Sequence, residues 1–138
     1  MKEVKLYAVA IVALFITAES KAQISVNADV VSSYVWRGTK YSGVSVQPSL
    51  NFTGGGLMIG TWGSAGFDDF HEMDLYIKYI FSFGLNLGVT DYYFPGNNYF
   101  DYSTENGSHG FELNAGYTLG GLSLSANYMI NEAGGAAT

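Results

Sequence analysis

The sequence predicts an all-β fold, an antiparallel up-and-down transmembrane β-barrel, from three features of the chain. Apolar and polar positions alternate, the alternating stretches are about nine to eleven residues long, and long connections follow short ones in turn. Successive side chains of a strand point to opposite faces, so strict alternation gives one apolar and one polar face. Strands of this length suit a tilted crossing of a bilayer.

The order of the connections points to a membrane wall. Between about seven predicted strands, reading from Ser25, the connections cover residues 38–44, 54–56, 66–71, 82–84, 95–109 and 120–121. Outer-membrane barrels have short periplasmic turns and longer outer loops. A soluble sandwich has no reason to keep its tight turns at one end. We therefore expect the N-terminus on the periplasmic side and the long loops outside.

The first 22 residues read as a secretory signal peptide. Lys2 and Lys5 give a basic start, residues 6–18 are mostly apolar, and Ser20 and Ala22 supply small residues where cleavage is determined. The apolar stretch is shorter than the roughly 20 residues that a membrane-spanning helix needs. We predict cleavage after Ala22 and export, with an uncleaved anchoring helix as the alternative.

The composition narrows the function of the remaining single domain, residues 23–138. The chain has no cysteine, which excludes disulfides, thiolate metal sites and a cysteine nucleophile. From residue 23 onward, three basic residues stand against ten acidic ones. Nucleic acid is therefore not an expected partner, because its phosphates require a basic stripe. Most of the acids lie in or near the longer loops.

Four predicted strands separate apolar from polar positions almost without error: residues 45–53, 72–81, 111–119 and 122–131. The stretch 25–37, predicted as the first strand, is noisier. The stretch 57–65 is ambiguous, because Trp62 shares its face with Gly60 and Ser64. Asp91 is the one serious exception, since it shares a face with Leu87 in the strand 85–94. A position at the outer rim or a β-bulge would accommodate it.

Alternation alone does not say which face is outside. In a soluble lipocalin-like barrel or a sandwich the apolar face forms the core, whereas in a membrane barrel it meets lipid. Aromatic residues toward the strand ends favour the membrane, because such residues form interfacial belts. These residues are Tyr34, Trp36, Tyr79, Phe81, Tyr93, Phe111 and Tyr128.

The predicted strand number is odd, whereas single-chain bacterial barrels have an even number and close on themselves. Residues 134–138 carry no strand pattern. We therefore expect residues 23–138 to form a barrel domain that lacks its C-terminal strands. Assembly of several chains into one barrel is the rarer alternative.

Several segments resemble the TorF-type putative porins, a family of conserved hypothetical exported bacterial proteins. The matching segments are residues 33–38 (SYVWRG), 60–64 (GTWGS), 72–76 (EMDLY) and 92–96 (YYFPG), with Glu112 and Gly116. Their order spans most of the mature chain. The resemblance implies an outer-membrane barrel with a channel role and brings no catalytic or ligand assignment. Family members continue beyond the point where this sequence stops.

Six charged residues fall on the polar face and are the candidates for lining the interior: Asp29, Arg37, Glu72, Asp74, Lys78 and Glu112. In a wide barrel such side chains bias which ions and solutes pass. In a narrow barrel they would pair into a salt-bridge plug. Both interpretations stay open.

The function that these observations favour is passive diffusion of small hydrophilic solutes or ions through the cell outer membrane. The partners are then outer-membrane lipid and the solutes, and we expect no cofactor, no metal and no catalysis. A surface-binding, adhesin-like barrel is one alternative, resting on the aromatic loop around Tyr99 and Phe100. A lipid-modifying barrel enzyme is another, and it would need a pair such as Ser64 and His71 to meet. Ser108 and His109 are adjacent in sequence, which points their side chains apart, and we expect both histidines at the surface.

Overall fold

The computed structural model describes residues 22–96, 98–103 and 107–131. The predicted signal peptide and residues 132–138 fall outside that part, apart from Ala22. The described chain forms nine strands and has no helix that is long and apolar enough to cross a membrane. The strands are β1 (Gln23–Val31), β2 (Tyr34–Trp36), β3 (Thr39–Ser42), β4 (Ser45–Gly54), β5 (Leu57–Gly66), β6 (His71–Ile80), β7 (Leu85–Tyr93), β8 (His109–Leu119) and β9 (Leu122–Asn131).

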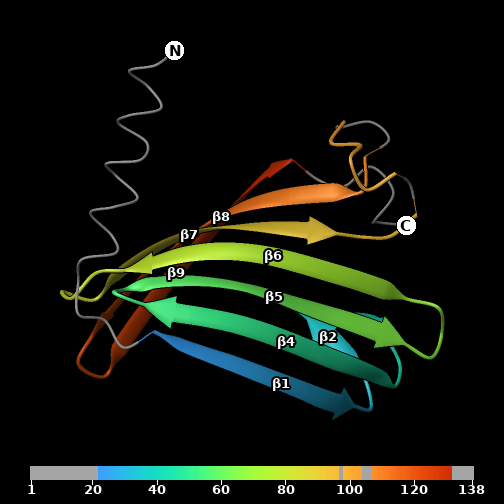
Figure 1. Ribbon diagram of the computed structural model, residues 1–138, viewed down its shortest axis with the longest axis horizontal. Helices are drawn as coiled ribbons and strands as arrows, with labels where there is room; N and C mark the ends of the chain where they lie inside the picture. Colours follow the sequence, from blue (N-terminus) through green and yellow to red (C-terminus); the bar gives the residue numbers. More distant parts are fainter. Residues whose placement is uncertain (1–21, 97, 104–106, 132–138) are drawn as a thin grey trace.

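Seven of these strands form one antiparallel sheet in the order β1-β4-β5-β6-β7-β8-β9 (Figure 1). Consecutive strands pair side by side, as an up-and-down arrangement requires, except that the β2-β3 hairpin is inserted between β1 and β4. The all-β, antiparallel part of the fold prediction is confirmed.

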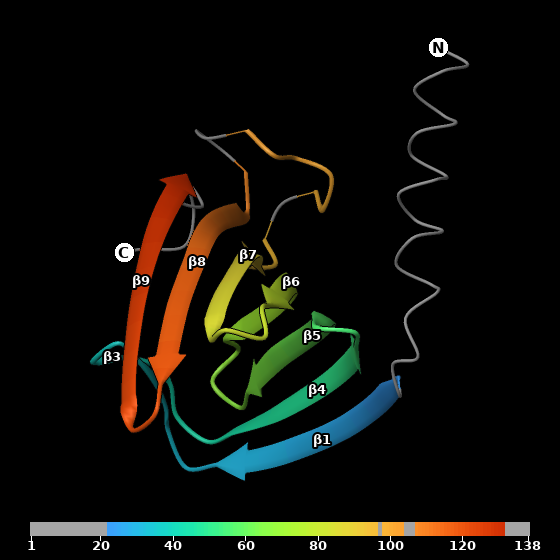
Figure 2. The same cartoon turned by 90° about the vertical axis from the view of Figure 1, so that its left-hand side faces the viewer.

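The sheet is an open trough. In the view turned by 90°, it curves from β1 round to β9 (Figure 2). Within the described residues β1 and β9 are its two edges, so this part of the chain does not close into a barrel. A closed transmembrane barrel stays a prediction.

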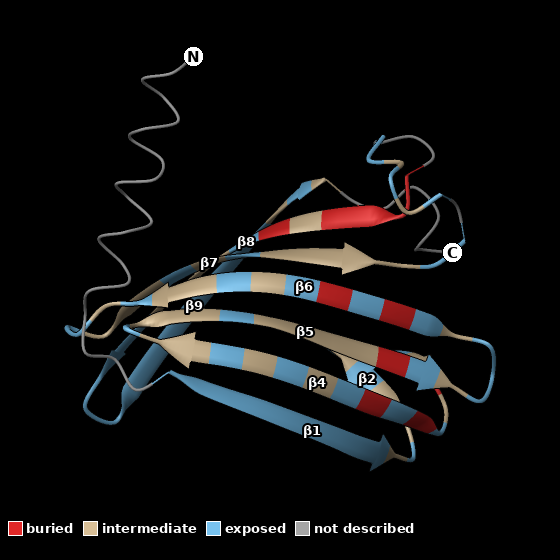
Figure 3. Ribbon diagram, in the orientation of Figure 1, coloured by how far each residue is buried: buried red, intermediate tan, exposed pale blue. Residues whose placement is uncertain are grey.

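The two faces differ in chemistry as the alternation predicts. Cross-strand pairs such as Ile77 with Val89 and Val89 with Leu113 form apolar rows, and these side chains are exposed. The opposite face carries polar residues, and its most buried members gather at one end of the sheet (Figure 3). We call this end, where the long connections lie, the loop end, and the other the turn end.

The short connections form tight turns at the turn end. Between β4 and β5 the turn is Gly55-Gly56, with φ of 58° and 84°. Positive φ at both positions is typical of the type I′ turn that matches the twist of a hairpin. At Gly56 a Cβ atom would also approach the carbonyl oxygen of Ile80 to 2.7 Å, so only glycine fits.

The first predicted strand is wrong in extent. β1 ends at Val31, and residues 34–42 fold into the separate β2-β3 hairpin instead of prolonging the wall. Its turn is Arg37-Gly38, with φ of 48° and 85°, again the type I′ pattern. Tyr34 and Trp36 are therefore not part of an interfacial belt on the apolar face.

Candidate functional site

The β2-β3 hairpin rests on the polar, concave face of the sheet at the loop end, and the candidate site is the surface between them. Arg37 at the hairpin tip reaches Glu112 of β8 with two bonds, Nη1 to Oε2 at 2.6 Å and Nη2 to Oε1 at 3.0 Å. A planar guanidinium matches a carboxylate in this two-bond geometry. The tip is thereby tied to a strand that lies 75 residues further along the chain.

Glu112 is the acceptor at the centre of a polar network. Its side chain is 1% exposed, and it accepts bonds from the Tyr92 hydroxyl at 3.1 Å and the Asn114 amide at 2.7 Å besides Arg37. Asn114 also donates to Asn127 of β9 and accepts from Thr90 of β7. Because all these donors converge on one carboxylate, the buried charge of Glu112 is fully compensated.

Arg37 combines three roles at the hairpin tip. Its φ of 48° lies in the left-handed region, which few residues other than glycine and asparagine adopt. Its guanidinium lies 4.1 Å from the ring centroid of Trp36, a cation-π contact. The bond with Glu112 raises its pKa further, so Arg37 is charged throughout the accessible pH range. The backbone strain is thus offset by an ion pair that only this side chain provides.

Aromatic rings fill the space between the hairpin and the wall. Tyr34 packs on Trp62 of β5 at 5.3 Å between centroids and on Phe70 at 6.0 Å. Trp36 meets Tyr92 of β7 edge-on at 5.7 Å, and Tyr41 meets Phe70 at 5.6 Å. Such pairs add to the gain from burial itself. The hairpin is therefore packed against the wall over its whole length.

Two further carboxylates lie beneath the hairpin. Glu72 and Asp74 occupy alternate positions of β6, across from Ser64 and Trp62 of β5. They are only 6% and 7% exposed. Unlike Glu112, each keeps one buried oxygen, Oε2 of Glu72 and Oδ1 of Asp74, that has no hydrogen-bond partner.

The base of the hairpin is held by a loop carboxylate. Asp68, in the connection between β5 and β6, accepts a bond from the Gly43 amide at 2.8 Å. The Phe67 amide donates to the Val44 carbonyl beside it. The bond from Gly43 holds the pKa of Asp68 below its usual value.

The six residues predicted to line the interior all point to the hairpin side of the sheet, but they form separate groups. Arg37 pairs with Glu112, and Glu72 lies beside Asp74. Asp29 is exposed on the edge strand β1, where it pairs in register with Gln47. Lys78 lies nearer the turn end of β6, in register with Gly88 and Met58. Whether these side chains line a conducting interior stays a prediction.

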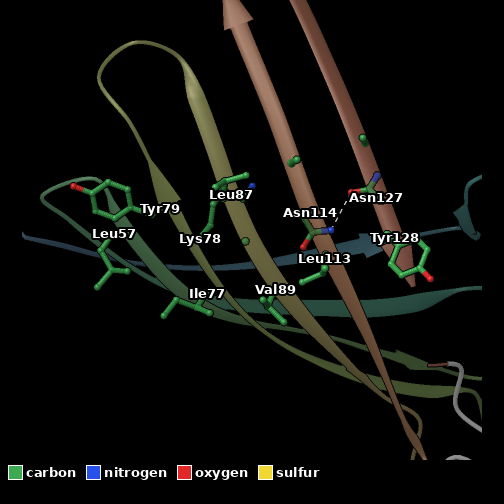
Figure 4. A pocket seen from close by; sticks show the side chains of 13 residues that line it. Leu57, Ile77, Lys78, Tyr79, Leu87, Val89, Leu113, Asn114, Asn127 and Tyr128 are labelled. Carbon is green, nitrogen blue, oxygen red and sulfur yellow. Dashed lines mark hydrogen bonds between the residues drawn. The ribbon is translucent and has the colours of Figure 1, made fainter. Parts of the chain in front are cut away.

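Among the depressions on the sheet, two differ clearly in chemistry. The larger, about 620 Å³, is lined mainly by apolar side chains of β5 to β9 (Figure 4). Among them are Leu57, Ile77, Leu87, Val89, Leu113 and Tyr128. The smaller, about 460 Å³, mixes polar and apolar groups and includes Lys78, Asn86, Thr90 and Ser125. The apolar depression suits hydrocarbon, and the mixed one suits water and hydrophilic solutes.

The histidine prediction is wrong for His109, which is fully buried. Its Nδ1 lies 2.8 Å from a carboxylate oxygen of Asp91, and its Nε2 lies 2.6 Å from the Tyr99 carbonyl oxygen. Both ring nitrogens therefore have a hydrogen-bond partner, one on the neighbouring strand and one in the loop before β8. The rings of Tyr93 and Tyr102 cover it, with centroids at 4.8 and 4.3 Å.

This pair also explains the exceptional position of Asp91. No bulge turns Asp91 inward, because β7 pairs in continuous register with β6 and β8. Asp91 keeps the apolar face, and its carboxyl group is paired there with His109 from the next strand. The sequence signal for this contact is an acid and a histidine on the same face of neighbouring strands. It depends on the register between the two strands, which the pattern within one strand does not give.

The serine and histidine considered for an enzyme do not meet. Ser64 is buried on the polar face and accepts a bond from Gln47 at 3.4 Å. His71 pairs in register with Ala65, so it belongs to the opposite face, and its Nδ1 lies 3.0 Å from the Asp69 carbonyl oxygen. Ser64 and His71 therefore do not form the pair that a lipid-modifying enzyme would need.

Comparison with known proteins gives a family without an assigned activity. The chain matches the family model described as "Bacterial protein of unknown function (Gcw_chp)" over residues 16–135. No curated protein and no solved structure matches it. This agrees with the conserved hypothetical character that the motif segments imply. The family match does not support the TorF porin designation.

Proposed function

The chain belongs to a family of bacterial proteins of unknown function, and from its own geometry we propose that it is the wall of an outer-membrane β-barrel. In this proposal the wall lets small hydrophilic solutes or ions diffuse passively, and it performs no covalent chemistry. The export signal predicted for residues 1–22 would deliver it to the envelope.

The observation that carries the proposal is the distribution of apolar side chains on the curved sheet. Large apolar residues on the face away from the hairpin are exposed along the strands, with Ile77 at 49% and Leu113 at 45%. A contiguous apolar surface of this extent marks a membrane or protein contact. A soluble barrel would enclose its apolar face, whereas here the concave side is polar. Lipid contact accounts for both faces.

The hairpin supports a narrowed passage. It lies on the concave side, as its contacts with Trp62, Tyr92 and Glu112 require, and it covers the loop end of the polar face. Acids outnumber bases around it, since Asp29, Glu72 and Asp74 have no basic partner among the described residues. A passage with such a lining favours cations over anions.

Conductance across a planar lipid bilayer tests the proposal. The full-length product should give discrete channel steps that favour cations. Replacing residues 35–41 by a short glycine-serine link should enlarge the steps, because the hairpin then no longer covers the polar face. Asp74→Asn should reduce the preference for cations. Phe67→Ala, at a loop side chain that is 79% exposed, is the matched control and should change nothing.

Two outcomes would contradict the proposal. Absence of conductance from a correctly inserted protein would exclude passive diffusion and favour an adhesin-like or structural wall. A water-soluble monomer that forms without detergent would exclude the membrane location altogether.

A further inference from the structure

Glu72 and Asp74 form a pair of carboxylates that is enclosed by the hairpin. Two residues along a strand span about 7 Å, and both side chains leave the same face of β6. Their carboxyl groups are close enough to interact directly. The Tyr34 hydroxyl of the hairpin lies against the Glu72 carboxyl group. Two acidic groups therefore share one small, covered volume.

This pair lacks the compensation that Glu112 has. One oxygen of each carboxylate, Oε2 of Glu72 and Oδ1 of Asp74, is buried without a hydrogen-bond partner. Two like charges in a covered site repel each other and lose hydration, so they require a counter-charge or a proton.

No basic side chain of the described residues supplies that counter-charge. Arg37 is committed to Glu112 by two bonds. Lys78 is four residues from Asp74 on the same strand, about 13 Å away. Lys40 is exposed on the hairpin and acts on the loop carboxylate of Asp68. What remains is a proton shared by the two carboxyl groups or a cation from outside the chain.

We propose that Glu72 and Asp74 bind a hard divalent cation of the Ca²⁺ or Mg²⁺ class. The two carboxylates and the Tyr34 hydroxyl offer oxygen at the pair, and oxygen is the ligand that these ions prefer. Water completes the coordination, as it commonly does for Mg²⁺ on one or two carboxylates. The proposed site depends on the geometry of the hairpin and does not require that solutes pass through the wall.

The degree of burial favours a bare ion over a larger cation. Exposures of 6% and 7% leave no approach for an organic ammonium group. The expected affinity follows from the small number of protein ligands. The described residues contain no group of three or more histidines, cysteines and acids that could hold a metal. A site with two carboxylates belongs to the weak class, with Kd of about 0.1 to 1 mM.

Bound at this position, the cation joins the hairpin to the wall. It would replace the repulsion between Glu72 and Asp74 by attraction, and Tyr34 would contact it from the hairpin. The hairpin is then fixed at two separate points, Arg37 with Glu112 at its tip and the ion below Tyr34.

Terbium luminescence tests the site, with Tb³⁺ as a probe for Ca²⁺ and the full chain in detergent micelles. Trp62 lies directly across from Asp74 and Tyr34 packs on Trp62, so bound Tb³⁺ should emit on excitation of these rings. Ca²⁺ should displace it at about millimolar concentration. The double variant E72Q/D74N should lose the emission, whereas D68N and D69N, at exposed loop acids, should keep it.

A thermal measurement separates binding from a folding defect. Ca²⁺ should raise the unfolding temperature of the wild type and leave that of E72Q/D74N unchanged. In a chelator the double variant should be at least as stable as the wild type, because it removes the buried repulsion. W62F keeps both carboxylates and should lose much of the Tb³⁺ emission while retaining the Ca²⁺ effect on the unfolding temperature.

The proposal is overturned if the folded wild type gives neither sensitised emission nor a Ca²⁺-dependent rise in unfolding temperature, since a shared proton would then account for the pair. It is equally overturned if E72Q/D74N binds as tightly as the wild type. Neither result depends on conductance, so the site and the proposed pore fail independently.

Discussion

At the scale of single residues, His109 shows how a polar group can be placed on an apolar face. Its two nitrogens lie within hydrogen-bond distance of the Asp91 carboxyl group and the Tyr99 carbonyl oxygen, and the rings of Tyr93 and Tyr102 cover it. The loop before β8 is thereby attached to the rim of the sheet. The polar groups of Asp91 and His109 thus satisfy each other on a face that is otherwise apolar.

Replacing the His109 ring by an apolar ring of similar shape should destabilise the rim. His109→Phe preserves the flat shape and leaves the largely buried carboxyl group of Asp91 without its partner. We expect a loss of about 3 kcal/mol of unfolding free energy, measured by urea unfolding in lipid vesicles. His71→Phe, at the exposed histidine, is the matched control and should change stability little. If H109F unfolds at the same urea concentration as the wild type, the contact between His109 and Asp91 does not stabilise the rim.

Glu112 is the second residue on which the arrangement depends. Glu112→Gln keeps the shape but removes the charge that Arg37 requires. Because the Arg37 side chain is 44% exposed and regains water, we expect a moderate loss, about 2 kcal/mol in urea unfolding. The double variant R37Q/E112Q should lose less unfolding free energy than the two single variants added together, because each single variant already breaks the same ion pair. Strict additivity would contradict a direct interaction.

At the scale of elements, the β2-β3 hairpin is the feature that the sequence predicts least well. Alternation continues from residue 25 to residue 37, so one long strand is the natural prediction. The Arg37-Gly38 turn follows no common hairpin signature, because arginine rarely adopts a positive φ. The contacts that hold Arg37 there come from β7 and β8, and local sequence does not contain them.

The hairpin base should respond to acid. A folded-state pKa of Asp68 below its ordinary value means that its contribution is complete above about pH 4 and is lost as the pH falls through the lowered value. In a W62F background, Trp36 fluorescence should therefore change below about pH 4 as the base loosens. Asp68→Asn should remove this change, because the amide oxygen accepts the Gly43 bond at every pH. Asp69→Asn should retain it.

The wall itself is well predicted from sequence. The four strands with clean alternation agree with β4, β6, β8 and β9, and the short turns 54–56, 82–84 and 120–121 agree with the connections β4-β5, β6-β7 and β8-β9. Periodicity predicts these elements because each alternation is a local property of the strand. The same reasoning places Glu72, Asp74, Lys78 and Glu112 on one face. It does not predict which of them pair, because pairing depends on register and on the hairpin.

At the scale of the whole molecule, the open trough has one face suited to hydrocarbon and one suited to water. A substitution on the apolar face distinguishes a lipid environment from a watery one. Val89, in the middle of β7, is 38% exposed and lies between Ile77 and Leu113. In water, arginine at such a position is tolerated.

In a bilayer, Val89→Arg should cost about 2 to 4 kcal/mol of unfolding free energy. Leu122→Arg, beside the Gly120-Gly121 turn, is the matched control and should cost no more than about 1 kcal/mol near the interface. Urea unfolding in vesicles of defined lipid measures both. Equal effects of the two substitutions would contradict a membrane midplane at Val89.

The tie between Arg37 and Glu112 also sets an order of assembly. The hairpin is made early in synthesis, yet the surfaces on which it docks belong to β5, β7 and β8, which follow later. Closing so long a loop is entropically costly before the intervening strands have paired. The hairpin therefore docks late in folding, and Trp36 should reach its final fluorescence only after the sheet has formed.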